Sequence, residues 1–469
     1  MRVLIIAANQ EQKPDPVVPL GAAYVAGAAR RAGHETRMFD ACFLGDEAAD
    51  RLAAELRDFQ PEVVGLSLRN IDDVAWPRAH SYLPHYRRLA QTVRAEAPES
   101  CLVLGGSAFT LMPELFLADL AADYGIAGEG EQAFPELLQR LDEGVLPARP
   151  RELGRRVFRA AVEALSQTEP ALDLLDLATY YARGGALNVQ TRRGCAFSCS
   201  YCTYPLLEGQ RSRLRDPAVV VDGIARVLQQ VGARHFFVVD NTFNLPLPHA
   251  HAFCAELRSR NLGVHWTAYI SPAGLTAELL QDMASAGCTS VEFGTDAAAP
   301  ATLKGLGKSF GAKEIVNASS WAREAGLRFA HSLILGGPGE TMQTLQETVS
   351  LIDSTRPTAV FGMLGVRLYP NTPMAKLAEH EGFLRRDAIG IEPMFYISEA
   401  VRDELEEFAA RKKAESPHWY FPGLEGERWV RFWRRRRAHG ARGPLWEFMG
   451  EEAGAAQSAG GGTHGGRKD

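Results

Sequence analysis

Three cysteines stand within eight residues of one another, at Cys195, Cys199 and Cys202. Three thiolates on one short segment suit a soft metal or an iron–sulfur cluster. A four-iron cluster has four corners, so three cysteine ligands leave one iron open. Because an open iron is a site of reaction rather than an electron carrier, the spacing C-x3-C-x2-C favours a catalytic cluster.

A structural zinc site would need a fourth cysteine or histidine at matching spacing, and none lies close by in the sequence. Two alternatives stay open, a zinc-binding triad and three unrelated cysteines. The other four cysteines lie in or beside expected helices and strands, and we interpret them as small core residues. They are Cys42, Cys101, Cys254 and Cys288. The odd total of seven predicts reduced thiols rather than a disulfide framework.

The cysteines directly follow the first strand of a segment, residues 187–373, in which strands and helices alternate. We expect its strands at 187–191, 235–239, 264–268, 290–294, 328–335 and 360–368. Six strand–helix units are too few for a complete eight-stranded barrel, so we predict a partial (β/α)6 TIM-type barrel. Loops that follow the strands of such a barrel build its active site, which is where the cysteines lie.

Residues 1–142 also alternate strands and helices, and their strands are apolar throughout. Strands are expected at 3–8, 36–39, 63–67, 102–104 and 123–127, and helices at 21–32, 47–59, 84–97 and 112–120. This pattern predicts an α/β fold with a doubly wound, Rossmann-like parallel sheet. Ligands of such sheets bind beyond the carboxyl ends of the strands. Here those ends carry residues 8–12, 68–73, 105–110 and 128–131.

Three further segments complete the expected organisation. Residues 143–186, with several prolines and arginines, are interpreted as a linker between the domains. Residues 374–450 are predicted to form a small helical region rich in aromatic residues. Residues 451–469 are dominated by glycine, alanine and serine, and we expect them to be disordered.

The composition excludes several classes of protein. The chain has 469 residues, of which 46% are hydrophobic and 23% charged, so it is neither mainly disordered nor collagen-like. No apolar run approaches the ~18–20 residues of a membrane span. The first strand is too short for the core of a signal peptide, so we expect a cytoplasmic protein with no membrane partner. A net charge of −6 argues against a nucleic-acid partner and favours a small-molecule or peptide substrate.

Some segments leave two interpretations open. Residues 428–437 could form a basic surface for nucleic acid or an acidic partner. We favour a helix that buries Trp429, Phe432 and Trp433 while its arginines stay solvated. Residues 418–422 either cover the barrel mouth or belong to the core. Asp72 and Asp73 face either a cofactor or solvent.

Together with Tyr201, which precedes the last cysteine, the triad resembles the signature of the radical S-adenosylmethionine (radical SAM) superfamily. The resemblance implies a [4Fe–4S] cluster held by Cys195, Cys199 and Cys202. It also implies that SAM binds the open iron through its amino and carboxylate groups. One electron, from an external donor such as flavodoxin or ferredoxin, would then cleave SAM to methionine and a 5′-deoxyadenosyl radical.

Further segments resemble the superfamily in the same order along the chain. Residues 294–297 are similar to its Gly-x-Glu-Ser segment, whose acid contacts the SAM ribose, although Asp296 is one methylene shorter. Residues 331–340 resemble the fifth-strand segment, whose glycines let the backbone approach adenosine. Asp240, in a looser match, stands where the superfamily contacts the methionine amino group. The resemblance therefore implies SAM contacts from Asp240, Asp296, Gly336, Gly337, Gly339 and Glu340.

The first domain resembles the cobalamin-binding domain that precedes the radical SAM domain in one large subfamily, through residues 19–21, 30–40, 105–107 and 128–131. The implied cobalamin-binding residues are Arg69, Asn70, Gly105, Gly106, Ser107, Gly128, Glu129 and Gly130. The Asp-x-His-x-x-Gly motif that supplies a histidine to cobalt is absent. We therefore expect base-off cobalamin without a histidine ligand, and an Arg69 below its lower face that disfavours ligation. A domain that keeps the fold without the cofactor is the alternative.

These resemblances, which cover roughly residues 1–375, imply a cobalamin-dependent radical SAM methyltransferase. We expect it to methylate an unactivated carbon of a small molecule or peptide in the biosynthesis of a specialised metabolite. No catalytic side chain is assigned. One alternative is a radical SAM cyclase, ring-contraction enzyme or oxidoreductase with cobalamin in another role or absent. The other is a non-catalytic metal-binding protein.

Overall fold

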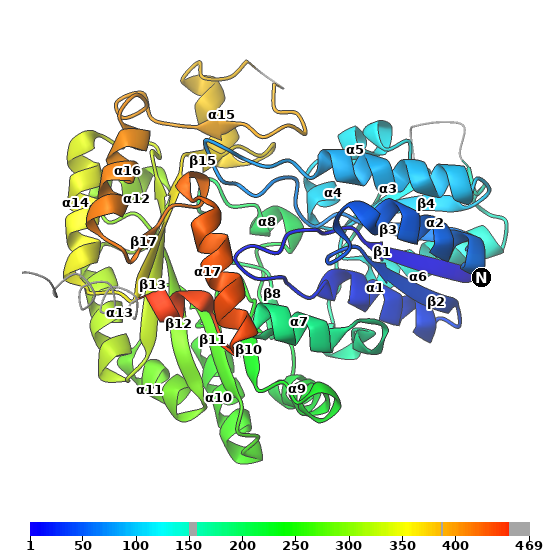
Figure 1. The fold of residues 1–469 in the computed structure, drawn as a ribbon, viewed down its shortest axis with the longest axis horizontal. Helices are drawn as coiled ribbons and strands as arrows, with labels where there is room; N and C mark the ends of the chain where they lie inside the picture. The colour runs from blue at the N-terminus through cyan, green and yellow to red at the C-terminus, as the bar shows by residue number, and fades with distance from the viewer. Residues whose placement is uncertain (150–156, 386–387, 450–469) are drawn as a thin grey trace, which may run out of the picture.

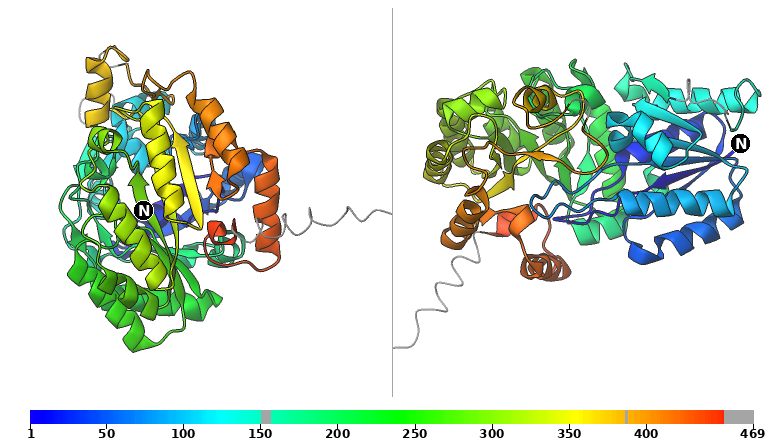
Figure 2. Two further views of the ribbon diagram at one scale, coloured as in Figure 1. Left: turned by 90° about the vertical axis from the view of Figure 1, so that its left-hand side faces the viewer. Right: turned by 90° about the horizontal axis from the view of Figure 1, so that it is seen from above.

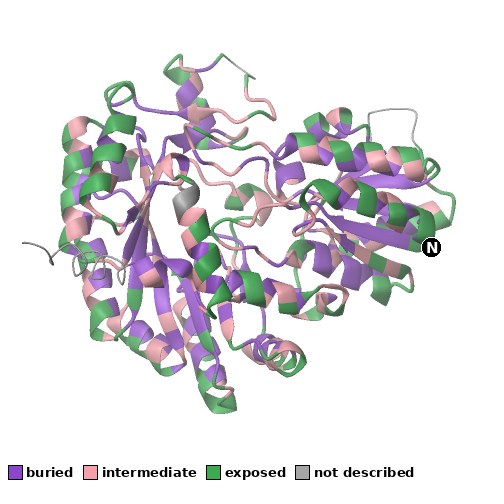
Figure 3. Cartoon of the chain, in the orientation of Figure 1, coloured by how far each residue is buried: buried purple, intermediate pink, exposed green. Residues whose placement is uncertain are grey.

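The computed structural model describes residues 1–149, 157–385 and 388–449, so the predicted disorder of 451–469 lies outside the described residues. Two parallel sheets lie side by side (Figures 1 and 2). In both, the central strands are buried and the outer faces of the helices are exposed (Figure 3), whereas the edge strands β2 and β6 are only partly buried. None of the helices described is long and apolar enough to span a bilayer.

The first sheet has six parallel strands in the order β2-β1-β3-β4-β5-β6, which confirms the predicted Rossmann-like domain. Its strands are β1 Arg2–Ala7, β2 Glu35–Asp40, β3 Val63–Ser67, β4 Cys101–Gly105, β5 Tyr124–Gly128 and β6 Val157–Ala160. Helices α1 (Leu20–Arg31) and α6 (Gly130–Asp142) contact each other, and their apolar residues share one core cluster with the strands. Helices α2 (Ala48–Phe59), α3 (Leu83–Glu96), α4 (Ser107–Leu111) and α5 (Pro113–Asp119) contribute to the other cluster.

The second sheet has seven parallel strands in the order β17-β14-β13-β12-β11-β10-β7 and forms the predicted partial barrel. Its strands are β7 Leu187–Val189, β10 His235–Val238, β11 His265–Ile270, β12 Cys288–Asp296, β13 Arg328–Leu335, β14 Ala359–Leu364 and β17 Trp419–Tyr420. The connecting helices are α9 Pro217–Val231, α10 Leu247–Arg260, α11 Ala277–Ser285, α12 Pro300–Gly305, α13 Ala312–Glu324 and α14 Met342–Ser354.

Short elements join and close this barrel. Two antiparallel pairs, β8 (Arg192–Arg193) with β9 (Arg213–Leu214) and β15 (Val366–Arg367) with β16 (Phe395–Tyr396), lie outside the main sheet. The remaining helices are α7 Leu177–Gly184, α8 Tyr204–Leu207, α15 Pro373–His380, α16 Leu405–Glu415 and α17 Glu427–Ala438.

The structure differs from the expected elements in three places. Residues 143–186, expected as a linker, contribute β6 to the first sheet and also contain α7. The helical C-terminal region supplies a seventh strand, β17, whose two residues are too few to show a periodicity. The strand expected at 360–368 is divided into β14 and β15, because Gly365 between them has a left-handed φ of 72°.

Candidate functional site

The three cysteines lie on the loop that joins β8 to α8, and all three are free thiols. The β8–β9 hairpin holds the start of this loop, where the Cys195 amide donates to the Gly209 carbonyl at 3.1 Å. Gly194 has a φ of 87°, and a Cβ there would collide with the Arg211 carbonyl. Glycine is therefore required immediately before the first cysteine, for both conformation and space.

A second contact braces the loop from α12 and the turn after it. The Ser200 amide donates to the Leu306 carbonyl at 2.9 Å, and the Ser200 hydroxyl donates to the Gly305 carbonyl at 3.1 Å. A Cβ at Gly307 would lie 2.9 Å from the Ser198 carbonyl oxygen. The cysteine loop thus packs directly on the segment that follows β12.

The surroundings of the thiols favour binding of a metal cluster over exposure of free thiolates to water. Burial raises the pKa of Cys199, and burial and the neighbouring thiols raise the pKa of Cys202 to about 12. Thiolates bind metal, so a positively charged cluster would offset the burial that keeps these groups protonated. Within the described residues, no three His, Cys, Asp or Glu side chains are arranged around a single ion. A four-iron cluster needs no such convergence, because each cysteine ligates a different iron.

Asp296 lies beside the cysteine loop, at the end of β12. Its carboxylate accepts hydrogen bonds from the Tyr201 hydroxyl and, at 2.6 Å, from the Lys308 ammonium. All three side chains are largely buried. Asp296 has a φ of 63°, a conformation that aspartate tolerates better than most residues. A contact between Asp296 and the SAM ribose stays a prediction.

The glycine turn at 336–340 packs behind α12. The Glu340 carboxylate accepts from the amides of Gly336 (2.6 Å) and Gly337 (3.3 Å), which closes the turn. A Cβ at Gly305 would collide with the Pro338 carbonyl, so α12 fits closely over this turn. Gly339 has a φ of 78°. The structure therefore links the turn to the cysteine loop through α12, and its predicted contact with SAM stays untested.

Asp240 is buried and is held by the chain just before the cysteines. Its carboxylate accepts from the Thr191 amide (2.8 Å), the Thr191 hydroxyl (2.5 Å) and the Arg192 amide (3.2 Å). Burial raises its pKa to about 6, although these hydrogen bonds oppose the shift. Asp240 thereby fixes the segment between β7 and β8, and its predicted contact with the methionine amino group stays a prediction.

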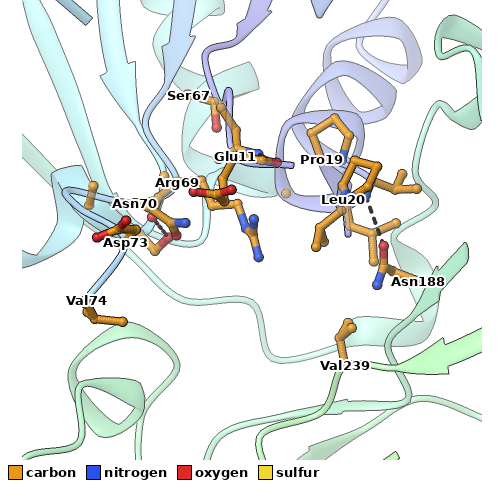
Figure 4. Close-up of a pocket in the computed structure, with 18 of the residues that line it drawn as sticks. Glu11, Pro19, Leu20, Ser67, Arg69, Asn70, Asp73, Val74, Asn188 and Val239 are labelled. Carbon is orange, nitrogen blue, oxygen red and sulfur yellow. Dashed lines mark hydrogen bonds between the residues drawn. The ribbon is translucent and has the colours of Figure 1, made fainter. Parts of the chain in front are cut away.

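A cavity of about 1230 Å³ lies between the two domains. The structure brings all the residues predicted to bind cobalamin to its wall: Arg69, Asn70, Gly105, Gly106, Ser107, Gly128, Glu129 and Gly130. Figure 4 shows Arg69 and Asn70 across this cavity from Asn188 and Val239 of the second domain. Thr203 and Tyr204, which directly follow the last cysteine, line the same cavity.

The glycines at this wall are required by packing within the chain as well as by any ligand. Gly106 has a φ of 93°, and a Cβ there would collide with the Leu68 carbonyl. Gly128 has a φ of 96°, and its Cβ would collide with the Ala160 carbonyl of β6. The Ser107 hydroxyl donates to the Arg69 carbonyl at 2.6 Å. These contacts fix the loop that carries Arg69 and Asn70.

Glu129 forms a link between the domains. Its carboxylate receives the Arg213 guanidinium in a bidentate pair at 2.6 and 2.7 Å. The adjacent Glu131 pairs with Arg193 at 2.6 Å, and all four side chains are buried. Neither arginine is predicted from the sequence, because no local pattern marks a partner that is more than 60 residues away.

Asp72 and Asp73, whose surroundings the sequence left open, both line the cavity but differ in role. The Asp72 carboxylate is buried and accepts from the Arg367 guanidinium at 2.8 Å. The Asp73 carboxylate accepts from the backbone amides of Ala75 and His80 at 3.2 and 2.8 Å. Asp72 therefore forms another ion pair between the domains, and Asp73 stabilises its own loop.

The C-terminal region forms one side of the cavity, from Tyr420 to Trp446. Helix α17 crosses the junction of the domains (Figure 1), and Arg437 pairs with Asp15 at 2.7 Å. Trp433 is buried, with Trp429 and Phe432 packed around it, while Arg434 and Arg435 are exposed. Trp419 and Phe421 of the 418–422 segment are core residues, whereas Tyr420 and Pro422 line the cavity.

Comparison with known proteins agrees with this division of the chain. Residues 13–138 match the B12 binding domain family, and residues 189–352 match the radical SAM superfamily. The chain is 26% identical to an uncharacterised methyltransferase of Pyrococcus horikoshii, over 79% of this chain and 82% of that protein. It is 24% identical to the tryptophan 2-C-methyltransferase of Streptomyces laurentii, over 79% and 74% of the two chains.

A solved structure has the same fold over almost the whole chain. It is the radical SAM methyltransferase TsrM of Kitasatospora setae, with its tryptophan substrate and a SAM analogue bound. The TM-score is 0.86 at 22% sequence identity, and the match covers 98% of this chain and 99% of that one. The likeness therefore extends to the C-terminal region as well as to the two sheets.

Proposed function

The chain is a radical SAM enzyme with an N-terminal B12-binding domain, and from this premise we propose that it is a cobalamin-dependent methyltransferase. The proposed reaction transfers a methyl group to an unactivated carbon of a small molecule or peptide, in the biosynthesis of a specialised metabolite. Its cofactors are a [4Fe–4S] cluster, SAM and cobalamin. An external reductant such as flavodoxin or ferredoxin supplies the electron.

One observation carries this proposal: the C-terminal end of the cysteine loop and the expected cobalamin-binding loops line a single cavity, although the three cysteines themselves do not line it. Thr203 and Tyr204, next to Cys202, share that cavity with Arg69, Gly105 and the barrel interior. A radical centre and a methyl donor must both reach the same substrate carbon, so they must open onto one space. Relatives named as methyltransferases over most of the chain support the same reaction.

The chain's own residues bind and orient the groups, while the cofactors supply the difficult chemistry. When bound, the cluster and SAM provide a hydrogen-abstracting radical, and cobalamin provides the methyl group. Cys195, Cys199 and Cys202 would hold the cluster. The buried Tyr201–Asp296–Lys308 hydrogen bonds fix the middle of the cysteine loop against β12.

Arg69 is the residue that we expect to contact cobalamin from below. It projects from the loop after β3 into the cavity, and within the described part of the chain it has no ion-pair partner. A guanidinium carries no free lone pair, so it cannot ligate cobalt as a histidine does. We propose that Arg69 covers the lower face and keeps the cobalamin base-off and without a protein ligand.

The test is anaerobic reconstitution with iron, sulfide and cobalamin, followed by analysis of bound metals and of SAM products. A methyltransferase of this kind should bind about four irons and one cobalamin per chain and release 5′-deoxyadenosine. It should also convert a second SAM to S-adenosylhomocysteine. Release of 5′-deoxyadenosine without formation of S-adenosylhomocysteine would instead favour the cyclase or oxidoreductase alternative. Bound zinc with no SAM cleavage would favour the non-catalytic alternative.

A further inference from the structure

The barrel interior presents a row of side chains to the cavity, and one of them is a carboxylate. Strand register places Tyr269 of β11 opposite Glu292 of β12, and Ser332 of β13 opposite Phe361 of β14. All four line the cavity, so they occupy the inward face of the sheet. Phe237 and Tyr420 extend this row on β10 and β17, which makes the wall around the carboxylate largely aromatic.

Glu292 has little compensation for its charge. The Ser332 hydroxyl donates to one of its oxygens at 2.6 Å, and no ion pair to Glu292 is found across the residues described. Burial raises its pKa to about 7, although the Ser332 hydrogen bond opposes this shift. A half-buried carboxylate in an aromatic wall is stabilised by a cation or by several donors, and the protein supplies one hydroxyl. A ligand in the cavity can supply the rest.

The neighbouring charged and titratable groups do not fill this role. Tyr269 and Tyr204 are about 40% exposed on the cavity wall, and desolvation raises their pKa values, so they stay neutral. The positive charge of Arg69 opposes the rise in the pKa values of these two tyrosines. Arg69 lies on a loop of the other domain, however, and forms no hydrogen bond to Glu292. Lys308, the cation near the end of β12, is already paired with Asp296.

We propose that Glu292 is a specificity-determining residue, which binds a protonated amine or similar cationic N–H group of the substrate. The aromatic wall would hold the apolar body of the same molecule. This inference rests on the proposed function, because it assigns the substrate to the cavity between the two domains. It narrows the substrate class to compounds that combine an apolar ring with a cationic nitrogen.

The test uses matched probes and the reconstituted enzyme with cluster and cobalamin bound. Tryptamine and indole-3-propionate share an indole ring and differ in the sign of their charge. We expect calorimetry to show at least tenfold tighter binding of tryptamine to the wild type, and no such preference in Glu292→Gln. Glu278→Gln, on the exposed surface of α11, is the control and should keep the preference.

A pH series gives a second readout. Tryptamine affinity of the wild type should rise about tenfold from pH 6 to pH 8 as Glu292 ionises, and should stay flat in Glu292→Gln. The proposal is overturned if neither probe binds, if the anion binds as well as the cation, or if Glu292→Gln keeps the preference. It is also overturned if Glu292→Gln weakens SAM binding equally.

Cobalamin content and SAM cleavage, measured on the same samples, separate this outcome from the proposed function. If both are normal and the tryptamine preference is absent, the role of Glu292 is wrong while the enzyme class stands. Loss of cobalamin binding or of SAM cleavage in the wild type would instead contradict the proposed function.

Discussion

At the residue scale, the cysteines divide into two groups with different surroundings. Cys195, Cys199 and Cys202 share one loop, whereas Cys254 is fully buried in the barrel core. The predicted core position of Cys254 is confirmed, because core position follows from apolar neighbours. The ligand role of the three loop cysteines follows from local spacing and stays a prediction. Neither inference needed a distant contact.

We expect Cys199→Ala to lose the cluster, because two thiolates cannot hold a four-iron cluster against solvent. Iron content should fall at least fivefold and SAM cleavage should become undetectable. Cys254→Ala is the control, since it removes a buried thiol of the same size and should retain iron. Normal iron content in Cys199→Ala would contradict the assignment of this ligand.

Arg69 permits a spectroscopic prediction. Arg69→His would place an imidazole, a common ligand of transition metals, where the guanidinium cannot ligate. We expect electron paramagnetic resonance of the cobalt(II) form to show nitrogen hyperfine splitting in the variant and none in the wild type. Arg78→His, which introduces an imidazole at an exposed position of the cavity rim, should resemble the wild type. Identical spectra for Arg69→His and the wild type would contradict the placement.

At the element scale, the cysteine loop depends on the turn after α12. Gly307→Ala should weaken cluster assembly, because the added Cβ would lie 2.9 Å from the Ser198 carbonyl at a left-handed φ of 70°. Gly326 has a similar φ of 75° and open space around it. Gly326→Ala is therefore the control, because it adds the cost of a left-handed backbone without a steric collision. We expect lower iron content in Gly307→Ala only. Equal iron content in the two variants would show that the contact with the loop does not matter.

The attachment of β17 and α16 to the barrel centres on Asp353. Burial raises its pKa, but hydrogen bonds from His418, Lys412 and Trp419 outweigh that effect and lower the pKa to about 2. A lowered pKa in the folded state stabilises the protein above the unfolded pKa of about 4, and this stability is lost as the pH falls toward 2. Because the side chain is about one-third exposed, we expect a contribution of about 1 kcal/mol.

Asp353→Asn should therefore lower the melting temperature at pH 7 and pH 5 by the same amount. The difference from the wild type should shrink only below about pH 4. Asp403→Asn, at an exposed position, is the control and should melt like the wild type. A difference that already closes between pH 7 and pH 5 would contradict the lowered pKa.

The sequence predicted most elements but not the short strands that lack an apolar run. The expected bounds of β3 and β13 match the structure, because their five and eight residues are rich in apolar side chains. By contrast, β6 and β17 have four and two residues, and neither has an apolar run of strand length. Glu292, a single polar residue within a strand, also carries no local pattern and was not predicted. The cobalamin-side loops were assigned from a resemblance, and their contact with cobalamin stays a prediction.

At the scale of the whole molecule, five buried or partly buried ion pairs among the described residues join the domains with the same arrangement of charge. In each of them the first domain supplies the carboxylate, and the rest of the chain supplies the arginine. The pairs are Asp15–Arg437, Asp72–Arg367, Glu129–Arg213, Glu129–Arg193 and Glu131–Arg193. Because charges out of water need their partners, these pairs specify how the two domains meet.

We expect Arg213→Met to destabilise the protein by about 3–5 kcal/mol, since it leaves the Glu129 carboxylate buried without its bidentate partner. Differential scanning calorimetry should show a lower melting temperature, and cobalamin affinity should fall because the cavity wall shifts. Arg211→Met removes an exposed arginine whose pair with Glu163 spans 3.9 Å, and it should change neither quantity. Equal behaviour of the two variants would show that the domains do not depend on this pair.

The C-terminal wall of the cavity has a consequence for the order of events during synthesis. Residues 419–446, which supply β17, α17 and one side of the cavity, leave the ribosome after the first sheet and the other six strands of the second sheet. Domains fold largely in the order in which they are translated. In a nascent chain, both domains can therefore be largely folded while the cavity between them is still open on that side. Large cofactors have their widest access in this interval, before translation ends.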